Sequence, residues 1–253
     1  MVRGLERFKE HFSSYNGQYL LIGGTACDLA MEEVGQSFRA TQDLDIVLCA
    51  EALTDEFIGA FWQFIRAGHY RFRERSDGRK EFYRFRNPQV EGFPKEIELF
   101  SRKPDILTVP TDSTLTPIPA ADDISSLSAI LLNEDYYAWI RAGGRKVNGI
   151  HIVGAEYLIP LKMKAWLDLS QRKRAGESID ARKIKKHPND VFRLYTILTL
   201  EPLPSVPVAV RQDVKMFIQK IKSVEIDFKN LGMGRLSMSE ALEGLGTVYG
   251  VNE

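Results

Sequence analysis

Cysteine is nearly absent from this sequence, and so are long apolar runs and any excess of one charge. The only two cysteines, Cys27 and Cys49, cannot make a disulfide framework. Thirty-four basic residues balance thirty-four acidic ones, so a polyanionic partner can be argued only from local patches. No apolar run approaches the roughly 20 residues that span a bilayer, and the charged N-terminus lacks the apolar core of a signal peptide. We therefore expect a soluble, cytoplasmic protein with reduced thiols and no membrane partner.

Strand and helix patterns alternate over the first 153 residues. Apolar residues at helical spacing predict helices over 5–12, 25–34 and 54–67. Alternating or short apolar runs predict strands over 18–22, 43–48, 70–75, 81–86 and 96–100. Ser76-Asp77-Gly78 predicts a hairpin between two of these strands. A Pro- and Thr-rich loop or edge region is expected over 104–119, and two or three further strands over 128–153.

After Gly154 the pattern becomes helical. Helices are predicted over 155–169, 181–199, 207–222 and 237–246, with a basic connector at 171–180. The fold class is therefore α/β (α+β), with a mixed sheet and flanking helices. We expect two domains, one of residues 1–153 and a helical one of residues 154–253.

Asp43 and Asp45 are the first candidates for chemistry. Residues two apart in a strand point to the same face, so the two carboxylates project together while Leu44 and Ile46 point into the core. Carboxylates this close repel each other unless a cation lies between them, and Mg2+ prefers oxygen ligands. An isolated Asp-x-Asp is more often a solvated acidic face, so the context decides.

The context begins with Gly23-Gly24-Thr25, which follows an apolar strand and opens a helix. Glycine lets the backbone approach a ligand, and the first N–H groups of a helix favour anions. Further along, Glu96 and Glu98 offer a third carboxylate to bind a metal or to act as a general base. Glu98 is preferred as the third acid because apolar residues flank it, but the choice between Glu96 and Glu98 remains open.

These residues resemble a known group of enzymes. Ile22-Gly23-Gly24, Asp43-Leu44-Asp45-Ile46 and Ile97-Glu98-Leu99 are similar to the signature of the DNA-polymerase-β-like nucleotidyltransferases. Gly23-Gly24-Thr25-Ala26 and the segment 39–45 resemble the AbiE-type (AbiEii) abortive-infection toxins within that superfamily. The resemblance spans about residues 20 to 200.

The resemblance implies a fold, an activity and a set of site residues. It implies a nucleotidyltransferase domain over 1–153, a helical domain closing the active-site cleft, Mg2+ (alternatively Mn2+) as the cofactor, and ATP or another nucleoside triphosphate as the substrate. Asp43, Asp45 and Glu98 would bind metal and act in catalysis together with Lys162 and Asp190. The nucleotide-binding residues would be Gly23, Gly24, Thr25, Arg39 and Thr41.

Two departures from the family pattern affect these assignments. The family usually has Gly-Ser where this chain has Gly23-Gly24, so the Thr25 hydroxyl is expected to replace that of the serine. The third acid is Glu where Asp is commoner. Lys164 points away from Lys162 on the same predicted helix, and we prefer Lys162 as the triphosphate-binding cation.

Two basic segments suggest an acceptor without identifying it. The predicted hairpin 70–86 alternates arginines with aromatics, which suits RNA or a solvated outer face of a sheet. Residues 172–186 carry seven Lys or Arg and two acids, which suits a basic lip over the site or a solvated connector.

We thus expect transfer of a nucleoside monophosphate to an RNA end, a protein side chain or a small molecule. RNA or protein is favoured, with a toxin-like role and a cognate antitoxin. The alternative is a catalytically silent nucleotide- or partner-binding module on the same fold.

Overall fold

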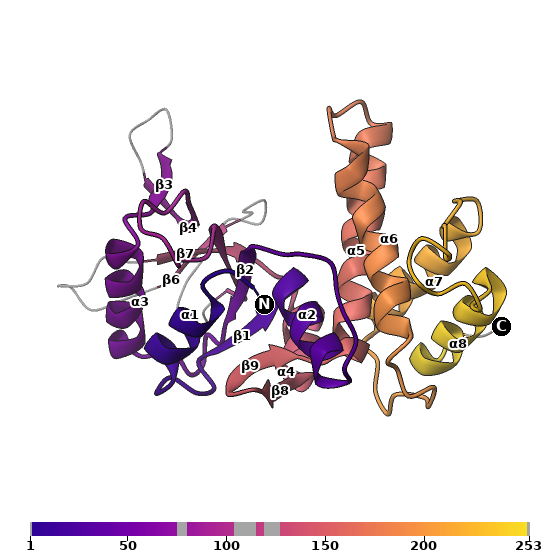
Figure 1. Cartoon of the computed structure of the whole chain (residues 1–253), viewed down its shortest axis with the longest axis horizontal. Helices are drawn as coiled ribbons and strands as arrows, with labels where there is room; N and C mark the ends of the chain where they lie inside the picture. Colours follow the sequence, from indigo (N-terminus) through magenta and orange to yellow (C-terminus); the bar gives the residue numbers. More distant parts are fainter. Residues whose placement is uncertain (1, 75–79, 104–114, 119–126, 252–253) are drawn as a thin grey trace.

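The computed structural model describes residues 2–74, 80–103, 115–118 and 127–251. A mixed sheet with helices against it forms the N-terminal part of the chain, and four helices follow (Figure 1). The fold class is the predicted α/β arrangement of a mixed sheet with flanking helices. The boundary between two domains near residue 153 stays a prediction.

The sheet brings together segments that are far apart in the chain. Its strands are β1 (Tyr19–Ile22), β2 (Asp43–Leu48), β3 (Arg71–Glu74), β4 (Lys80–Arg86), β5 (Glu96–Ser101), β6 (Leu115–Ile118), β7 (Leu127–Leu131), β8 (Gly144–Val147) and β9 (Ile150–Val153). The main order is β3-β4-β5-β2-β1-β9-β8, and β7 pairs with β5 and β6. β2 runs antiparallel to β1 and parallel to β5, so β2 is central.

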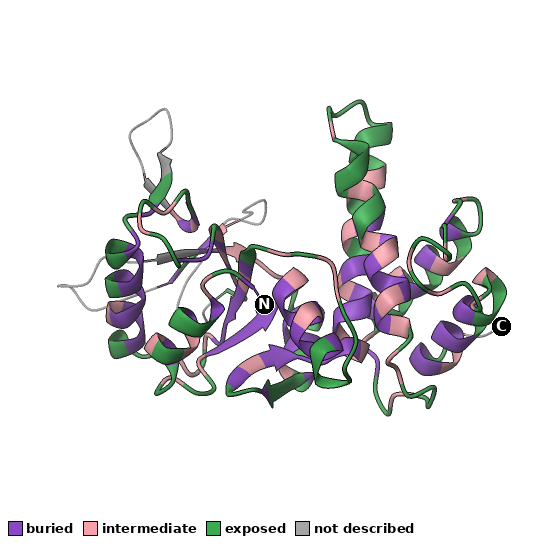
Figure 2. Ribbon diagram, viewed as in Figure 1, coloured by how far each residue is buried: buried purple, intermediate pink, exposed green. Residues whose placement is uncertain are grey.

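The helices are α1 (Leu5–Phe12), α2 (Gly23–Glu33), α3 (Asp55–Ala67), α4 (Glu134–Ala142), α5 (Ala155–Arg174), α6 (Ala181–Tyr195), α7 (Val208–Ile221) and α8 (Met238–Tyr249). α2 packs against β1 and β2 on one side and α5 on another. α5 and α6 lie side by side as a hairpin, which projects beyond the rest of the chain (Figure 1). The projecting end of this hairpin is exposed (Figure 2).

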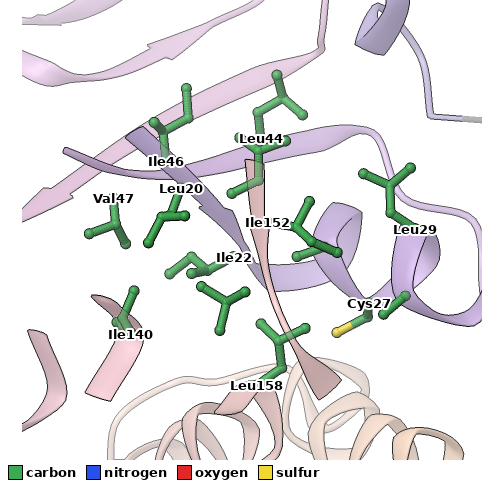
Figure 3. Close-up of a cluster of buried hydrophobic side chains, with 14 of the residues drawn as sticks. Leu20, Ile22, Cys27, Leu29, Leu44, Ile46, Val47, Ile140, Ile152 and Leu158 are labelled. Atoms are coloured by element: carbon green, nitrogen blue, oxygen red, sulfur yellow. The ribbon is translucent and has the colours of Figure 1, made fainter. Parts of the chain in front are cut away.

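Alternation along β2 separates the core from the candidate site. Leu44 and Ile46 are fully buried, whereas Asp43 is exposed and Asp45 is half-buried. Leu44 and Ile46 pack in the cluster that also contains Ile152 and Leu158 (Figure 3). The period-two burial of the apolar positions therefore holds the two aspartates on the opposite face.

Most predicted elements are present, although α2 begins at Gly23 rather than Thr25, α6 ends at Tyr195 rather than at residue 199, and two segments differ more. Residues 134–142, expected within the strands of 128–153, form α4 because Asn133 caps the helix and the buried Tyr136, Tyr137, Trp139 and Ile140 recur at helical spacing. Residues 171–174 continue α5 rather than forming a connector. In the 104–119 region, expected to be a loop or an edge, the described residues 115–118 form β6, which pairs with β7 at the edge of the sheet; the remainder and the predicted turn 76–78 lie outside the described residues.

Both cysteines are buried as free thiols, as expected from the sequence. Across the described ranges, no helix combines the length and apolar character that a membrane span requires.

Candidate active site

Four carboxylates meet on one face of the sheet. β2 and β5 are parallel, and their register places Asp43 beside Glu96 and Asp45 beside Glu98. Opposite residues of neighbouring strands share a face of the sheet. The acids that the sequence suggested as a set are therefore neighbours in the structure.

The aspartate pair carries negative charge that its surroundings do not fully compensate. Burial raises the pKa of Asp45 above its ordinary value; Asp43 adds to the rise, while Lys162 and Lys186 oppose it. Burial, followed by the charge of Glu96, raises the pKa of Asp43. A further cation between the two carboxylates would therefore stabilise their charged forms.

Gly23 joins β1 directly to α2 beside this pair. Its φ of +70° lies in the left-handed region that favours glycine. A Cβ at this position would overlap with Oδ2 of Asp45, so no side chain fits while that carboxylate keeps its place. The backbone at the start of α2 thus packs directly against the metal-binding candidate.

The space beside Gly24 is occupied by the side chain of Thr41. A Cβ there would lie 2.6 Å from Oγ1 of Thr41 and 3.7 Å from Nη2 of Arg39. The Thr41 hydroxyl therefore occupies the space beside the turn that a residue-24 side chain would need. α2 also begins without a side-chain cap from any described residue, so its first N–H groups suit an anion.

Thr25 has a role different from the one expected for its hydroxyl. The side chain is fully buried, and Oγ1 donates a hydrogen bond to the main-chain oxygen of Asp43 at 2.8 Å. It therefore ties α2 to β2 and is not open to a phosphate in this structure. Only the expectation of a contact through its hydroxyl is corrected, because the main-chain N–H still belongs to the first turn of α2.

Arginines from β4 engage the glutamates of β5. Arg84 forms an ion pair with Glu98 and lies 3.4 Å, from Nε to Oε1, from Glu96. Nε of Arg86 lies 2.9 Å from Oε2 of Glu96. Burial raises the pKa of Glu98 to about 7; Arg84 opposes this rise, while Asp45 and Glu96 add to it. Both candidates for the third acid therefore have a cationic partner already.

A buried ion cluster joins the second half of the chain to the sheet. Arg39 donates Nε to Oδ1 and Nη2 to Oδ2 of Asp190, both at 2.8 Å. Nζ of Lys162 lies 3.3 Å from Oδ2 of the same carboxylate. Asp190 is 0% exposed and Lys162 is 6% exposed, so the three groups fix one another in a poorly solvated place.

The charges in this cluster are maintained by their partners. Burial alone would raise the pKa of Asp190, but hydrogen bonds from Arg39 and the charge of Lys162 hold it below its ordinary value. Burial would lower the pKa of Lys162, yet Cys27 and Asp190 raise it. Burial raises the pKa of the Cys27 thiol to about 11, and the charge of Lys162 opposes this rise.

Lys164 lies outside the cluster, as its position on the helix predicts. Its side chain is half exposed and pairs with Asp213 at 3.0 Å. Lys162 instead acts electrostatically on Asp45. The structure thus brings Lys162, but not Lys164, to the aspartates.

Lys186 is a charged group near the aspartates that sequence reasoning did not select. Its charge lowers the pKa of both Asp43 and Asp45. Burial, followed by repulsion from Arg39 and Lys162, lowers the pKa of Lys186 itself. Lys186 and Asp190 are four residues apart and share a helix face, and this spacing is the signal that could have identified Lys186.

The arginine hairpin is only partly described. Arg71 is exposed and Phe72 is partly exposed on β3, while Arg84 faces the glutamates of β5. The side chain of Arg73 and all of Arg75 lie outside the described residues. The hairpin therefore contributes Arg84 to the acidic site, and its use as an RNA surface stays a prediction.

The acidic face fits a divalent cation in part. Among the described residues, no group of three or more His, Cys, Asp or Glu side chains is arranged to hold a metal ion. Asp43 and Asp45 suit a hard cation because they are adjacent oxygen donors with uncompensated charge. Glu98 would join them only after Arg84 moves away.

Comparisons with known proteins give distant likenesses. No protein-family model and no curated protein matches the chain. It is similar to the structure of an antigenic nucleotidyltransferase-like protein from Paracoccidioides brasiliensis, at 16% identity and a TM-score of 0.46, over 97% of this chain and 92% of the other. A putative nucleotidyltransferase from H. pylori is similar at 15% identity and a TM-score of 0.41, over 96% of this chain and 88% of the other.

A lincosamide antibiotic adenylyltransferase with bound lincomycin is also similar, at 14% identity and a TM-score of 0.39, over 77% of this chain and 96% of the other. All three TM-scores are below 0.5, which marks these likenesses as distant.

Proposed function

We propose that the protein is a nucleotidyltransferase dependent on Mg2+ or Mn2+, which moves a nucleoside monophosphate from a nucleoside triphosphate to an acceptor hydroxyl. The observation that carries this proposal is the packing of the Gly23 backbone against the Asp45 carboxylate. It brings an uncapped helix start, suited to phosphate, directly to an aspartate pair suited to a divalent cation. Phosphoryl and nucleotidyl transfer need these two elements at one point.

The triphosphate would lie between the start of α2 and the cations of α5 and α6. The N–H groups of residues 23–25 would hold phosphate oxygens, and the Thr41 hydroxyl lies beside them at Gly24. Lys162 and Lys186 would offset charge that develops on the departing pyrophosphate. Asp43 and Asp45 would hold the divalent cation, which supplies neutralisation of the phosphate oxygens when bound.

Asp190 and Arg39 act on this arrangement through Lys162. Their mutual hydrogen bonds fix the Asp190 carboxylate, which in turn fixes the ammonium group. Arg39 also lies next to Gly24, so it connects the cluster to the turn that would hold phosphate. We propose that Asp190 positions Lys162 and does not touch the reacting atoms.

In the chemical step, the acceptor oxygen would form a bond to the α-phosphorus while the bond from that phosphorus to the pyrophosphate oxygen breaks. The hydroxyl proton would pass to a carboxylate of β5. Glu98 suits this role because it neighbours Asp45 and its pKa is raised to about 7. Arg84 must leave Glu98 before that carboxylate can accept the proton or join the metal.

The acceptor and the biological role extend the proposal further. An RNA end or a protein side chain is favoured over a small molecule, and ATP is the first nucleotide to test. A toxin-like role, with a cognate antitoxin, is supported by the sequence resemblance to AbiE-type proteins alone.

The test is incubation with each labelled nucleoside triphosphate, Mg2+ and total cell RNA or protein. Wild type should transfer label to one acceptor class and release pyrophosphate. The Asp43→Ala/Asp45→Ala variant is the control, and equal labelling by wild type and this control would contradict the proposal.

One observation favours a second candidate function, a catalytically silent nucleotide-binding module. Arg84 and Arg86 engage Glu98 and Glu96, so a positive charge lies where a metal-binding third acid would be needed. Such a module would be stabilised by nucleoside triphosphate in thermal melts without any release of pyrophosphate. Pyrophosphate release that depends on Asp45 would exclude it.

A further inference from the structure

A groove of about 620 Å³ lies between α5, α6 and the end of α7, away from the carboxylates of the sheet. Its apolar lining includes Trp166 of α5, Ile184 and Pro188 of α6, and Val224 after α7. The volume falls within the range of ligand-binding clefts in proteins. Trp166 is 6% exposed and Pro188 is buried, so the accessible apolar surface comes mainly from Ile184 and Val224 and suits a weakly polar group such as a nucleic-acid base.

The rim of this groove is cationic. Lys173, Arg174, Lys185 and Lys220 line it, against the single acid Glu225. Within the described part of the chain, none of these four cations forms an ion pair with an acidic side chain. Their charge is therefore available to a ligand.

The rest of the α5–α6 hairpin continues the same charge. Residues 172–186 contain seven basic and two acidic residues. The two acids are already bound by arginines of the hairpin, Glu177 by Arg172 at 2.7 Å and Asp180 by Arg182 at 3.1 Å. The hairpin end is exposed and projects from the body of the protein (Figure 2). An extended row of cations suits a ligand with regularly repeated negative charge.

We propose that this groove binds a strand of single-stranded RNA, which is the acceptor of the transfer. The phosphates would contact the lysines of the rim, and bases would lie against Ile184, Val224 and the small exposed part of Trp166. An acidic peptide would match the cations but would leave the apolar lining without a partner of the right shape. As an assignment of the acceptor, the inference rests on the proposed nucleotidyltransferase function.

The groove and the aspartates are reached by neighbouring residues of the same two helices, α5 and α6. Lys185 lines the groove, while the next residue, Lys186, acts electrostatically on Asp43 and Asp45. On α5, Lys162 and Trp166 are four residues apart, about 6 Å along the helix axis. The end of an RNA strand held in the groove therefore has to cross only α5 and α6 to reach the aspartates.

The first experiment measures binding of a labelled, mixed-sequence RNA oligonucleotide by fluorescence anisotropy, without nucleotide or metal. The triple variant Lys173→Gln/Lys185→Gln/Lys220→Gln should bind at least about tenfold more weakly than wild type. A plot of the logarithm of the association constant against the logarithm of the salt concentration has a negative slope. Loss of three phosphate contacts should make this slope less steep by about 2. The matched control, Lys146→Gln/Lys215→Gln/Lys229→Gln, has the same net charge but an intact groove and should bind like wild type.

Two outcomes would overturn the inference. Equal binding by both triple variants would place the RNA elsewhere. Displacement of the RNA by polyglutamate at an equal concentration of charge would show simple ion exchange, as an acidic-peptide site would.

Failure of this inference can be distinguished from failure of the proposed function. If labelled nucleotide is transferred to another acceptor while the groove variant behaves like wild type, the RNA assignment is wrong and the enzyme proposal stands. If RNA binds in the groove but no nucleotide is transferred to any acceptor, the enzyme proposal fails and the binding site stands.

Discussion

The guanidinium group of Arg39 holds both carboxylate oxygens of Asp190, although the two residues are 151 positions apart in the chain. Arg39 precedes β2 and Asp190 lies in α6, so this contact connects the sheet to the C-terminal helices. Lys162 of α5 completes it through the same carboxylate. One buried acid thus helps to fix the position of the helices relative to the aspartates.

Replacing that acid should destabilise the protein. Asp190→Asn leaves Arg39 and the buried Lys162 without their counter-charge, which we expect to cost about 3 kcal/mol of unfolding free energy. In a protein of this size the thermal midpoint should fall by about 10 °C. Asp168→Asn, which removes an exposed carboxylate 3.6 Å from Arg172, is the matched control and should barely change the midpoint. Similar midpoints for both variants would contradict the importance of the cluster.

The same carboxylate should make stability depend on acid pH. The pKa of Asp190 is lower in the folded protein than its ordinary value of 3.8, so its contribution is complete above that value and is lost as the pH falls through the folded pKa. Urea denaturation of wild type and Asp190→Asn at several pH values measures the difference in unfolding free energy. We expect this difference to be constant near neutral pH and to shrink below about pH 4.

Asp45 should show a conflict between stability and activity. Burial and the charge of Asp43 raise its pKa, so its ionised form destabilises the ligand-free protein. Asp45→Asn should therefore raise the thermal midpoint without metal, while nucleotidyl transfer falls at least about a hundredfold. Adding Mg2+ should stabilise wild type but not the variant. A variant that is both less stable and fully active would show that Asp45 is an ordinary surface acid.

Gly24 and Thr41 should be energetically coupled. In Gly24→Ser the new Cβ would lie 2.6 Å from Oγ1 of Thr41, so this single change should lower both stability and transfer. Thr41→Ala should reduce transfer by removing a hydroxyl beside the phosphate turn. In the double variant the serine gains space and supplies a hydroxyl, so transfer should exceed that of either single variant. If the free-energy losses that the two single variants show in kcat/KM simply add in the double variant, the serine does not replace the Thr41 hydroxyl.

Arg84 should compete with a metal for Glu98. Arg84→Gln removes the cation paired with Glu98, so the affinity for Mn2+, measured by isothermal titration, should increase several-fold. Arg86→Gln is the matched control because Arg86 pairs with Glu96, and its effect should be smaller. If neither variant changes the affinity, Glu98 takes no part in holding the metal.

Much of the sheet could be predicted from the sequence because its signals are local. The alternation of Asp43, Leu44, Asp45 and Ile46 indicated the strand and its two faces, and the structure has the same alternation of exposed and buried residues. Gly23 marked the turn into α2, although the helix begins there and not at Thr25. In α4 the aromatic residues favour strands by propensity, and only the Asn133 cap and helical spacing indicated otherwise.

The partners of the site residues could not be predicted because they depend on long-range register. Pairing of β4 with β5 brings Arg84 to Glu98, and no local pattern reveals this pairing. Likewise, Thr25 is fully buried because α2 packs against β2, so its hydroxyl bonds to the Asp43 backbone. The spacing of Lys186 and Asp190 indicates a shared helix face, but the closeness of Lys186 to the aspartates follows from the packing of α6, which no local pattern reveals.

The buried thiol of Cys27 gives the protein an internal reporter. It is fully covered in α2, which packs against α5. A maleimide can reach it only when these helices separate, so its labelling rate, read apart from that of the buried Cys49 by peptide mapping, reports such openings. Opening of the molecule around its substrates could thus be followed without introducing a new cysteine.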